Sequence, residues 1–277
     1  MTFKHVVLPM SNTTIYVGDA LALIPTLARA SVNLVVTSPP YPGQYGNDLS
    51  PGDWLRWTHD WLWILRSRLA PNAVIALNVQ FKRNMRGWYD HLILQLGNPV
   101  WLGNYNVLDL YIYGKSNPPP NGPLTYCDPP GWEFVFILTN AERPQDVTFN
   151  PVRRAYSSKS IRNDGRLYSN MSQNGTTPHP DGARQTTLMV MSKSADQNRP
   201  SAKGISFPRS LPDRFIRQYT NPGALVLDPF CGVGTTLKVA SILGRESIGF
   251  EIDPAEADRA REWLAEPIQR PLIEAVL

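Results

Sequence analysis

The stretch ALVLDPFCGVGTTLKVA, residues 224–240, decides the fold, because it combines an apolar strand, a glycine-rich turn and a helix. The strand ends at Asp228, and Gly232 and Gly234 allow a ligand to approach the main chain closely. We expect Thr235 and Thr236 to cap the helix, whose first amide groups then point at the ligand. Taken alone, the same pattern also fits an ordinary tight strand-to-helix connection.

Two acids near this turn indicate what kind of ligand it holds. Asp228 can meet an ammonium group, and Glu251 ends the next apolar stretch, 23 residues later. An acid at that spacing accepts hydrogen bonds from both ribose hydroxyls in nucleoside-binding α/β folds. A pyrophosphate would need a third glycine and positive charge, whereas Asp228-Pro229-Phe230 offers an acid and a ring. The turn therefore suits a cationic nucleoside without phosphates.

Strands and helices alternate outward from this turn. Strands are predicted over 14–17, 32–36, 73–79, 107–113, 132–139, 224–228 and 247–250, and helices over 20–30, 54–69, 85–96 and 211–219, from about 235 and from 254. Pro25 is expected to bend or restart the first helix, and Asp53 to cap the second. Residues 141–204 show no hydrophobic periodicity. The alternation of strands and helices indicates an α/β fold with a doubly wound, mostly parallel sheet.

A second stretch, LVVTSPPYPGQYG at residues 34–46, ends an apolar strand abruptly. Neither Pro39 nor Pro40 can donate a ladder hydrogen bond, so the strand cannot continue through them. One interpretation is a plain strand end followed by a turn. The other is that Ser38 and Tyr41 hold a flat chemical group at the carboxyl end of the strand.

Composition limits the alternatives. The 277 residues carry a net charge of +4, and residues 141–203 hold ten lysines and arginines against five acids, whereas the rest holds 17 against 18. The positive charge therefore lies in one segment and suggests a polyanionic partner. No apolar stretch is long enough to span a membrane, and two cysteines and four histidines form no disulfide framework or metal site. We expect a cytoplasmic protein without a metal.

The two motifs together resemble those of the amino-methylating DNA methyltransferases that use S-adenosylmethionine. Ser38-Pro39-Pro40-Tyr41 matches the catalytic motif (D/N/S)PP(Y/F) of that family, and residues 228–236 match its cofactor motif DPFxGxGTT. Ser38 precedes Asp228 by 190 residues, an order similar to the circularly permuted β group. The resemblance implies a Rossmann-like methyltransferase fold with an inserted DNA-recognition region. It covers nearly the whole chain except residues 141–203.

The resemblance also implies a division of the chain and a set of site residues. Residues 1–140 would be the catalytic half, 141–203 the target-recognition region and 204–277 the cofactor-binding half. Asp19, in YVGDAL, would lie near the adenine of the cofactor, and Phe207 in the segment that leads into the cofactor strand. The cofactor-binding set is Asp19, Phe207, Asp228, Pro229, Phe230, Gly232, Gly234, Thr235, Thr236 and Glu251.

Ser38 also bears on the target base. Thr37-Ser38-Pro39-Pro40-Tyr41 looks like the cytosine-N4 enzymes of the family, whereas Asp or Asn at position 38 goes mostly with adenine-N6 methylation. The expected reaction is direct in-line displacement on a flipped base. The side-chain oxygen of Ser38 and the carbonyl of Pro39 would hold the amino group, and Tyr41 would stack on the base. Cytosine-C5 methylation would need a cysteine nucleophile, usually after a proline, and the sequence has no Pro-Cys.

The basic segment is expected to bind double-stranded DNA, although alone it also fits a solvated surface loop. Its candidate contacts are Arg153, Arg154, Lys159, Arg162, Arg166 and Arg184. The enzyme would act in a restriction-modification system or as an orphan methylase, and a homodimer and a cognate restriction endonuclease stay open as partners. Adenine-N6 methylation, an RNA substrate, protein glutamine methylation and a non-catalytic nucleic-acid-binding module remain alternatives.

Overall fold

The computed structural model describes residues 5–7, 12–42, 49–80, 105–115, 131–154, 181, 183–191 and 207–266. In these ranges one large sheet has the strand order β1-β2-β11-β10-β3-β4-β6-β5-β9. Its strands are β1 (His5–Val7), β2 (Thr13–Val17), β3 (Val32–Thr37), β4 (Leu69–Gln80), β5 (Asn106–Lys115), β6 (Trp132–Thr139), β9 (Leu188–Met191), β10 (Leu225–Asp228) and β11 (Glu246–Glu251). A separate ribbon pairs β7 (Arg153–Arg154) with β8 (Ala183–Arg184).

The centre of the sheet is parallel, which confirms the predicted α/β class. Strands β2, β11, β10, β3 and β4 pair in parallel in that order, and β5 pairs in parallel with β9. Antiparallel pairing joins β4 to β6, β6 to β5 and β1 to β2. Because β10 and β3 are parallel neighbours, the segments that follow them leave the sheet at the same edge.

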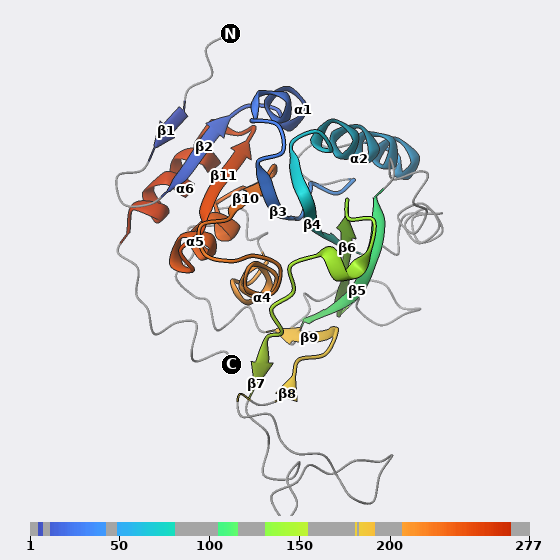
Figure 1. Cartoon of the computed structure of the whole chain (residues 1–277). Coiled ribbons are helices and arrows are strands. Elements are labelled where there is room, and N and C mark those ends of the chain that lie inside the picture. The colour runs from blue at the N-terminus through green and yellow to red at the C-terminus, as the bar shows by residue number, and fades with distance from the viewer. Residues whose placement is uncertain are drawn as a thin grey trace, which may run out of the picture.

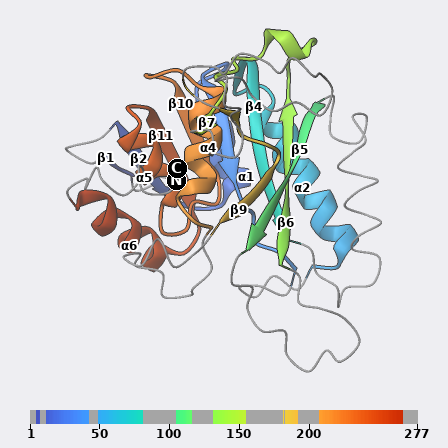
Figure 2. The same ribbon diagram turned by 90° about the horizontal axis from the view of Figure 1, so that it is seen from below.

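Helices cover both faces of the sheet. They are α1 (Ala20–Leu23), α2 (Pro51–Leu65), α4 (Ser210–Tyr219), α5 (Thr235–Ile242) and α6 (Pro254–Ala265), with short 3₁₀ turns η1 (Ile24–Thr26) and η2 (Pro144–Asp146). Figure 1 shows α1 and α2 on one side of the sheet and α4 and α5 on the other. Seen from below, α2 lies beside β4, β5 and β6 (Figure 2).

Strand β3 contributes side chains to the hydrophobic clusters on both faces of the sheet. Val35 packs in the cluster formed with α1 and α2, while Leu34 and Val36 pack in the cluster formed with α4 and α5. Successive side chains of a strand point to opposite faces, so a strand covered on both sides must be apolar throughout. This explains why the sequence reads as an unbroken apolar run up to Thr37, and it fixes the point where the next loop begins.

The first two helices differ in their bounds from the prediction, and the second ends at Leu65 rather than at residue 69, where β4 begins. Helix α2 begins at Pro51, and its N-cap is Ser50, whose hydroxyl accepts from the Asp53 amide at 3.2 Å. Asp53 was therefore wrong as the cap, because Ser50 followed by a proline at the first helical position is the stronger start signal. Helix α1 ends at Leu23, and Pro25 restarts the chain as the 3₁₀ turn η1 rather than extending a helix to residue 30.

Residues 141–204, which show no hydrophobic periodicity, nevertheless contain regular structure. This segment contributes η2, the ribbon strands β7 and β8, and β9, which pairs with β5 in the large sheet. Strand β9 is short, and the residues before it are polar, so periodicity over a longer window does not detect it. The helix predicted over 85–96 lies outside the described residues.

Candidate active site

The two motifs meet at the edge of the sheet where β3 and β10 end. Val226 pairs with Leu34 and Leu227 pairs with Val35, so Thr37 and Asp228 finish their strands side by side. The loop with Ser38 and the turn with Gly232 therefore leave the same edge of the sheet. In open α/β sheets, ligands bind outside the carboxyl ends of the strands, at the point where the strand order reverses.

Asp228 fastens these two segments together. Its Oδ1 accepts from the Thr37 hydroxyl at 2.7 Å and from the Phe230 amide at 3.2 Å, and its Oδ2 accepts from the Thr236 hydroxyl at 2.8 Å. Burial raises the pKa of Asp228 to about 6, while these hydrogen bonds act to lower it. The carboxylate thus binds three groups of the protein itself and holds the start of the turn rigid.

The glycine turn has the conformation that its sequence requires. Gly232 and Gly234 have φ angles of 50° and 81°, in the left-handed region that favours glycine. The Gly232 amide donates to Oε2 of Glu251 at 2.9 Å, and the Cys231 amide donates to the carbonyl of Phe250 at 2.9 Å. These hydrogen bonds hold the turn against the end of β11, beside Glu251, the acid predicted to bind a ribose.

The expected threonine caps are not formed. Gly234 is the N-cap of α5, and no side chain caps that end of the helix. Thr235 and Thr236 are instead the first two residues of the helix, and the Thr236 hydroxyl donates to Oδ2 of Asp228. The Thr235 hydroxyl is buried without a hydrogen-bond partner among the described residues.

Glu251 keeps the capacity to bind a ligand. Oε1 accepts from the Asp253 amide at 2.9 Å and Oε2 from Gly232, so each oxygen retains a second lone pair. Burial raises the pKa of Glu251, against the lowering effect of these two amides. A side chain built on Gly232 would meet nothing within 4 Å. This open space, the spare acceptors of Glu251 and the unpartnered Thr235 hydroxyl fit a ribose-bearing nucleoside.

Other predicted cofactor residues lie in different settings. Asp19 is the exposed N-cap of α1, and the neighbouring Gly18 amide donates to the carbonyl of Glu251 at 2.9 Å, so it reaches the same edge. Phe230 packs against Trp57 and Trp61 of α2, with ring centroids 5.2 and 5.5 Å away. Phe207 packs against the core cluster that contains α4.

The catalytic loop is held by α2. The indole of Trp54 donates to the carbonyl of Pro40 at 2.7 Å, whereas no hydrogen bond in the described part of the chain engages the carbonyl of Pro39. Tyr41 is 4% exposed, and its ring lies tilted against Trp54 at a centroid distance of 6.5 Å. A base could stack on the Tyr41 ring only after the loop moves. Ser38 is half-buried.

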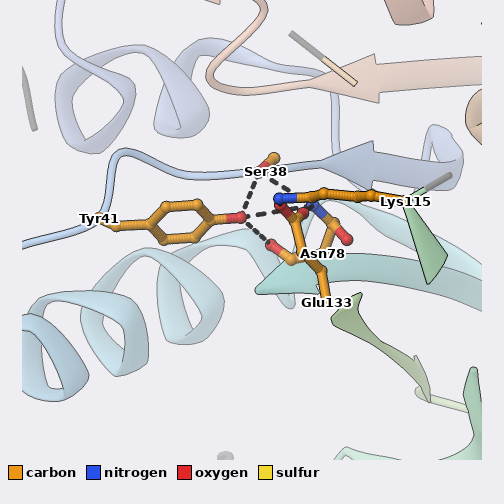
Figure 3. A network of polar contacts seen from close by, with 5 residues as sticks. All are labelled: Ser38, Tyr41, Asn78, Lys115 and Glu133. Carbon is orange, nitrogen blue, oxygen red and sulfur yellow. Dashed lines mark hydrogen bonds and ion pairs between the residues drawn. The ribbon is translucent and has the colours of Figure 1, made fainter. Parts of the chain in front are cut away.

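Three residues that the sequence analysis missed complete this site (Figure 3). Asn78 of β4 donates through Nδ2 to Ser38 Oγ at 3.3 Å and to Glu133 Oε2 at 2.5 Å. Glu133 of β6 forms an ion pair with Lys115 of β5 at 2.5 Å. The Tyr41 hydroxyl lies 2.5 Å from Ser38 Oγ. The available signal was a polar residue inside each apolar strand, Asn78 in AVIALNV and Glu133 in WEFVFILT.

The arginines of the basic segment are described only in part. In the β7–β8 ribbon, Arg153 lies directly opposite Arg184, and Arg154 opposite Ala183. Figure 1 shows this ribbon projecting from the body of the molecule near β9. The buried guanidinium of Arg214, on α4, holds the base of the ribbon: it donates to Gln185 Oε1 at 2.8 Å. Lys159, Arg162 and Arg166 lie outside the described residues.

Other kinds of chemistry find little support in the described ranges. They contain no group of three or more residues that could hold a metal ion, and no helix there is long and apolar enough to cross a membrane. Burial raises the pKa of the Cys231 thiol well above its ordinary value, and the negative charges of Asp228 and Glu251 add to this effect. Cys231 is therefore an unreactive packing residue.

Comparisons with known proteins agree with this geometry. The sequence profile of the N6/N4 methylase family, described as "DNA methylase", matches residues 32–262. The type II methyltransferase M.ScaI of Streptomyces caespitosus is 25% identical over 262 residues, covering 87% of this chain and 78% of its own length. The type II methyltransferase M.PvuII of Proteus hauseri is 26% identical over 279 residues, covering 88% and 81%.

Solved structures share the fold. The PvuII DNA methyltransferase (cytosine-N4-specific) aligns with a TM-score of 0.69 and 20% identity over 96% of this chain and 90% of that chain. The M1.HpyAVI–SAM complex aligns with a TM-score of 0.60 and 19% identity, covering 92% and 100%. The predicted Rossmann-like methyltransferase fold is thereby confirmed.

Proposed function

The chain belongs to the N6/N4 DNA methylase family, and on that premise we propose that it methylates the N4 amino group of cytosine in double-stranded DNA. S-adenosylmethionine is its methyl donor and supplies an electrophilic methyl group on a sulfonium. The observation that carries the proposal is the pairing of β3 with β10. This pairing places the end of β3, where the Ser38-Pro39-Pro40-Tyr41 loop begins, beside the glycine turn. Methyl donor and target amino group would meet between these two loops.

The glycine turn and β11 would hold the cofactor. Glu251 would accept hydrogen bonds from the ribose hydroxyls through its spare lone pairs, and Gly232 would leave room for the ligand against the main chain. Asp19 would lie on the adenine side, because it follows β2 at the same edge. Asp228 already binds Thr37, Phe230 and Thr236, so its main task would be to fix the turn that the cofactor contacts.

The SPPY loop would orient the target amino group. The nitrogen lone pair of an exocyclic amine is delocalised into the base, so acceptors must turn the group before it attacks. Ser38 Oγ and the carbonyl of Pro39 would be these acceptors, since the carbonyl of Pro40 is already bound by Trp54. Displacement would then rest on positioning. The base would be flipped from the duplex, with Tyr41 stacking on it after a movement of the loop.

Cytosine is favoured over adenine by Ser38 and by the relatives. The solved relative with a TM-score of 0.69 is titled cytosine-N4-specific, and both curated relatives are type II methyltransferases. We therefore assign this protein to the modification side of a restriction-modification system. Arg153 and Arg184 of the ribbon, together with Arg154, would contact phosphates of the duplex.

A direct assay tests the proposal. Purified protein is incubated with labelled S-adenosylmethionine and diverse unmethylated duplex DNA, the DNA is digested, and the nucleosides are identified by mass spectrometry. N4-methylcytosine supports the proposal in full, whereas N6-methyladenine overturns the base assignment but keeps the reaction. Cofactor binding without any methylated base would favour a non-catalytic nucleic-acid-binding module, or an RNA or protein substrate.

Two serine variants sharpen this assay. Ser38→Ala removes the proposed acceptor and should lower the single-turnover rate at least about tenfold, which corresponds to roughly 1.4 kcal/mol in the barrier. Ser31→Ala is the matched control, because Ser31 lies just before β3, at the opposite edge, and its hydroxyl donates to the carbonyl of Ala28. Equal rates for the two variants would contradict the role of Ser38.

A further inference from the structure

The orientation of the Asn78 amide is fixed by its partners. Asn78 Nδ2 lies 2.5 Å from Glu133 Oε2, and the Glu133 carboxylate, paired with Lys115, can only accept. The amide nitrogen must therefore face Glu133. Asn78 Oδ1 is left buried without a hydrogen-bond partner among the described residues. Such an orphaned acceptor is unfavourable, so the ion pair, and not the amide itself, determines the orientation.

The hydrogen of Tyr41 can be placed by the same reasoning. Burial raises the pKa of the Tyr41 phenol well above its ordinary value, with Glu133 adding to the effect, so Tyr41 carries one hydrogen. The main-chain carbonyl of Asn78 lies 3.1 Å from the hydroxyl and can only accept. Tyr41 donates to this carbonyl. Because Tyr41 has one hydrogen, the arrangement that satisfies both contacts makes Ser38 the donor in the 2.5 Å contact between Tyr41 and Ser38, and the Tyr41 hydroxyl also lies 3.4 Å from Asn78 Nδ2.

These hydrogen-bond directions determine whether the Ser38 hydroxyl can donate to a ligand or accept from it. Its single hydrogen points to Tyr41, one lone pair faces Asn78 Nδ2 at 3.3 Å, and the second lone pair has no partner among the residues that the structure describes. We propose that Lys115, Glu133 and Asn78 are positioning residues that hold Ser38 Oγ as a pure hydrogen-bond acceptor for the target amino group. This inference rests on the proposed function, since it concerns the same amino nitrogen.

This choice between donating and accepting matters for the chemistry. A serine that was free to rotate could donate its hydrogen to the amino nitrogen, and the electron pair that attacks the methyl group would then be occupied. A serine that can only accept pulls on an N–H bond instead and leaves that electron pair free. The network fixes this choice at Ser38 before the base arrives.

A double variant tests the proposal, because it exchanges the amide and the carboxylate at positions 78 and 133 and keeps the hydrogen bond between them. In Asn78→Asp with Glu133→Gln, the glutamine at 133 can accept from Lys115 and donate to the aspartate at 78. The buried volume, the summed charge and the hydrogen bond are kept, but the group that faces Ser38 becomes an acceptor and draws its hydrogen away from Tyr41. Unfolding free energy, cofactor affinity by calorimetry, KM for DNA and the single-turnover rate are then measured.

We expect the double variant to regain the stability and cofactor affinity that either single variant loses. KM for DNA should stay within about twofold of wild type, while the single-turnover rate remains at least about tenfold lower, equivalent to roughly 1.4 kcal/mol. Asn140→Asp is the matched control. Asn140 also has a buried, unpartnered amide oxygen, but it bonds the carbonyl of Ala70 at the far end of β6. A wild-type rate in the double variant overturns the proposal.

A second variant covers the case in which the double variant does not fold. In Glu133→Gln alone, the glutamine oxygen stays with Lys115, its nitrogen faces Asn78, and the Asn78 amide must turn over. We expect a shifted side-chain amide resonance for Asn78 and a single-turnover rate that stays at least about tenfold lower at saturating cofactor and DNA. An unshifted resonance or an unchanged rate overturns the proposal. Failure of the proposed function is distinct, because the wild-type protein itself would then methylate no DNA.

Discussion

The hydroxyl of Thr37 donates a 2.7 Å hydrogen bond to Oδ1 of Asp228, although 191 residues separate the two in sequence. Thr37 is the last residue of β3 and precedes Ser38, while Asp228 is the last residue of β10 and opens the glycine turn. This side-chain contact and the pairing of β3 with β10 together hold the loop proposed to bind the base beside the turn proposed to bind the methyl donor.

Replacing Thr37 should damage both stability and catalysis. Thr37→Val keeps the shape but leaves the buried carboxylate of Asp228 short of one donor, so we expect a loss of about 1–3 kcal/mol in the free energy of unfolding. The control is Thr58→Val, because the buried Thr58 hydroxyl has no hydrogen-bond partner in the described structure. Urea unfolding and single-turnover rates check both variants. Equal effects at the two sites would refute the linking role of Thr37.

The buried carboxylate of Asp228 predicts a pH dependence with a definite sign. Its pKa is raised from 3.8 to about 6 on folding, so its favourable contribution is complete below pH 3.8 and is lost as the pH rises through 6. The full change is about 3 kcal/mol. Asp228→Asn removes this titration. The wild-type free energy of unfolding minus that of the variant should therefore fall between pH 4 and 7; a flat difference would contradict the prediction.

Gly249 should tolerate no side chain. A Cβ there would lie 2.6 Å from Leu237 Cδ1 and 2.7 Å from Cys231 Sγ, since the glycine turn packs directly on β11. We expect Gly249→Ala to lower the free energy of unfolding by about 1–3 kcal/mol and to weaken cofactor binding. Gly52→Ala, in the first turn of α2 with nearest neighbours at 4.0 Å, should be neutral or stabilising. Calorimetric titration and thermal unfolding measure both.

Arg214 should matter for DNA although it is buried. It donates to the Gln185 side chain and reaches the carbonyls of Gln185 and Val152, so it fixes both strands of the ribbon at their base. Arg214→Met should weaken DNA binding several-fold and leave cofactor affinity unchanged. Arg56→Met removes the same charge from the exposed face of α2 and serves as the control. If both variants bind DNA equally well, the anchor has no functional role.

The ribbon arginines should contribute to the salt dependence of the DNA-binding constant. Arg153 and Arg184 are directly opposite each other in the ribbon, so one phosphate could lie near both. Arg153→Gln and Arg184→Gln should each reduce the slope of log K against log salt by about 1. Arg29→Gln, at the exposed turn before β3, should leave the slope unchanged. Fluorescence anisotropy at several salt concentrations measures the slopes, and unchanged slopes for the ribbon variants would exclude phosphate contacts.

The sequence predicted those parts of the site that depend on local signals. Asp228, Gly232 and Ser38 each follow an apolar strand within one contiguous motif, and parallel strands bring such ends to one edge. Glu251 was placed by its distance from Asp228 along the chain. These predictions needed no knowledge of how distant strands pair.

The residues that escaped prediction depend on long-range pairing. Asn78 meets Glu133 only because β4 and β6 are antiparallel neighbours, and 55 residues separate the two. Ser50 was overlooked as a cap because Asp53 also fits the pattern, and the two bind each other in the structure. Strand β9 joins the sheet through β5, a partner that hydrophobic periodicity cannot identify.

The β7–β8 ribbon has a consequence for how new specificities could arise. Its ladder holds residues 154 and 183 opposite each other, so the intervening segment leaves and re-enters the fold at one point. The entropy of closing a loop grows only with the logarithm of its length, and doubling it costs about 0.6 kcal/mol. If residues 155–182 carry the target recognition expected from the sequence, a segment of another length could join the same two ribbon strands at little entropic cost, while β3 and β10 keep their pairing. Under that proposal, target choice and chemistry could change separately in one chain.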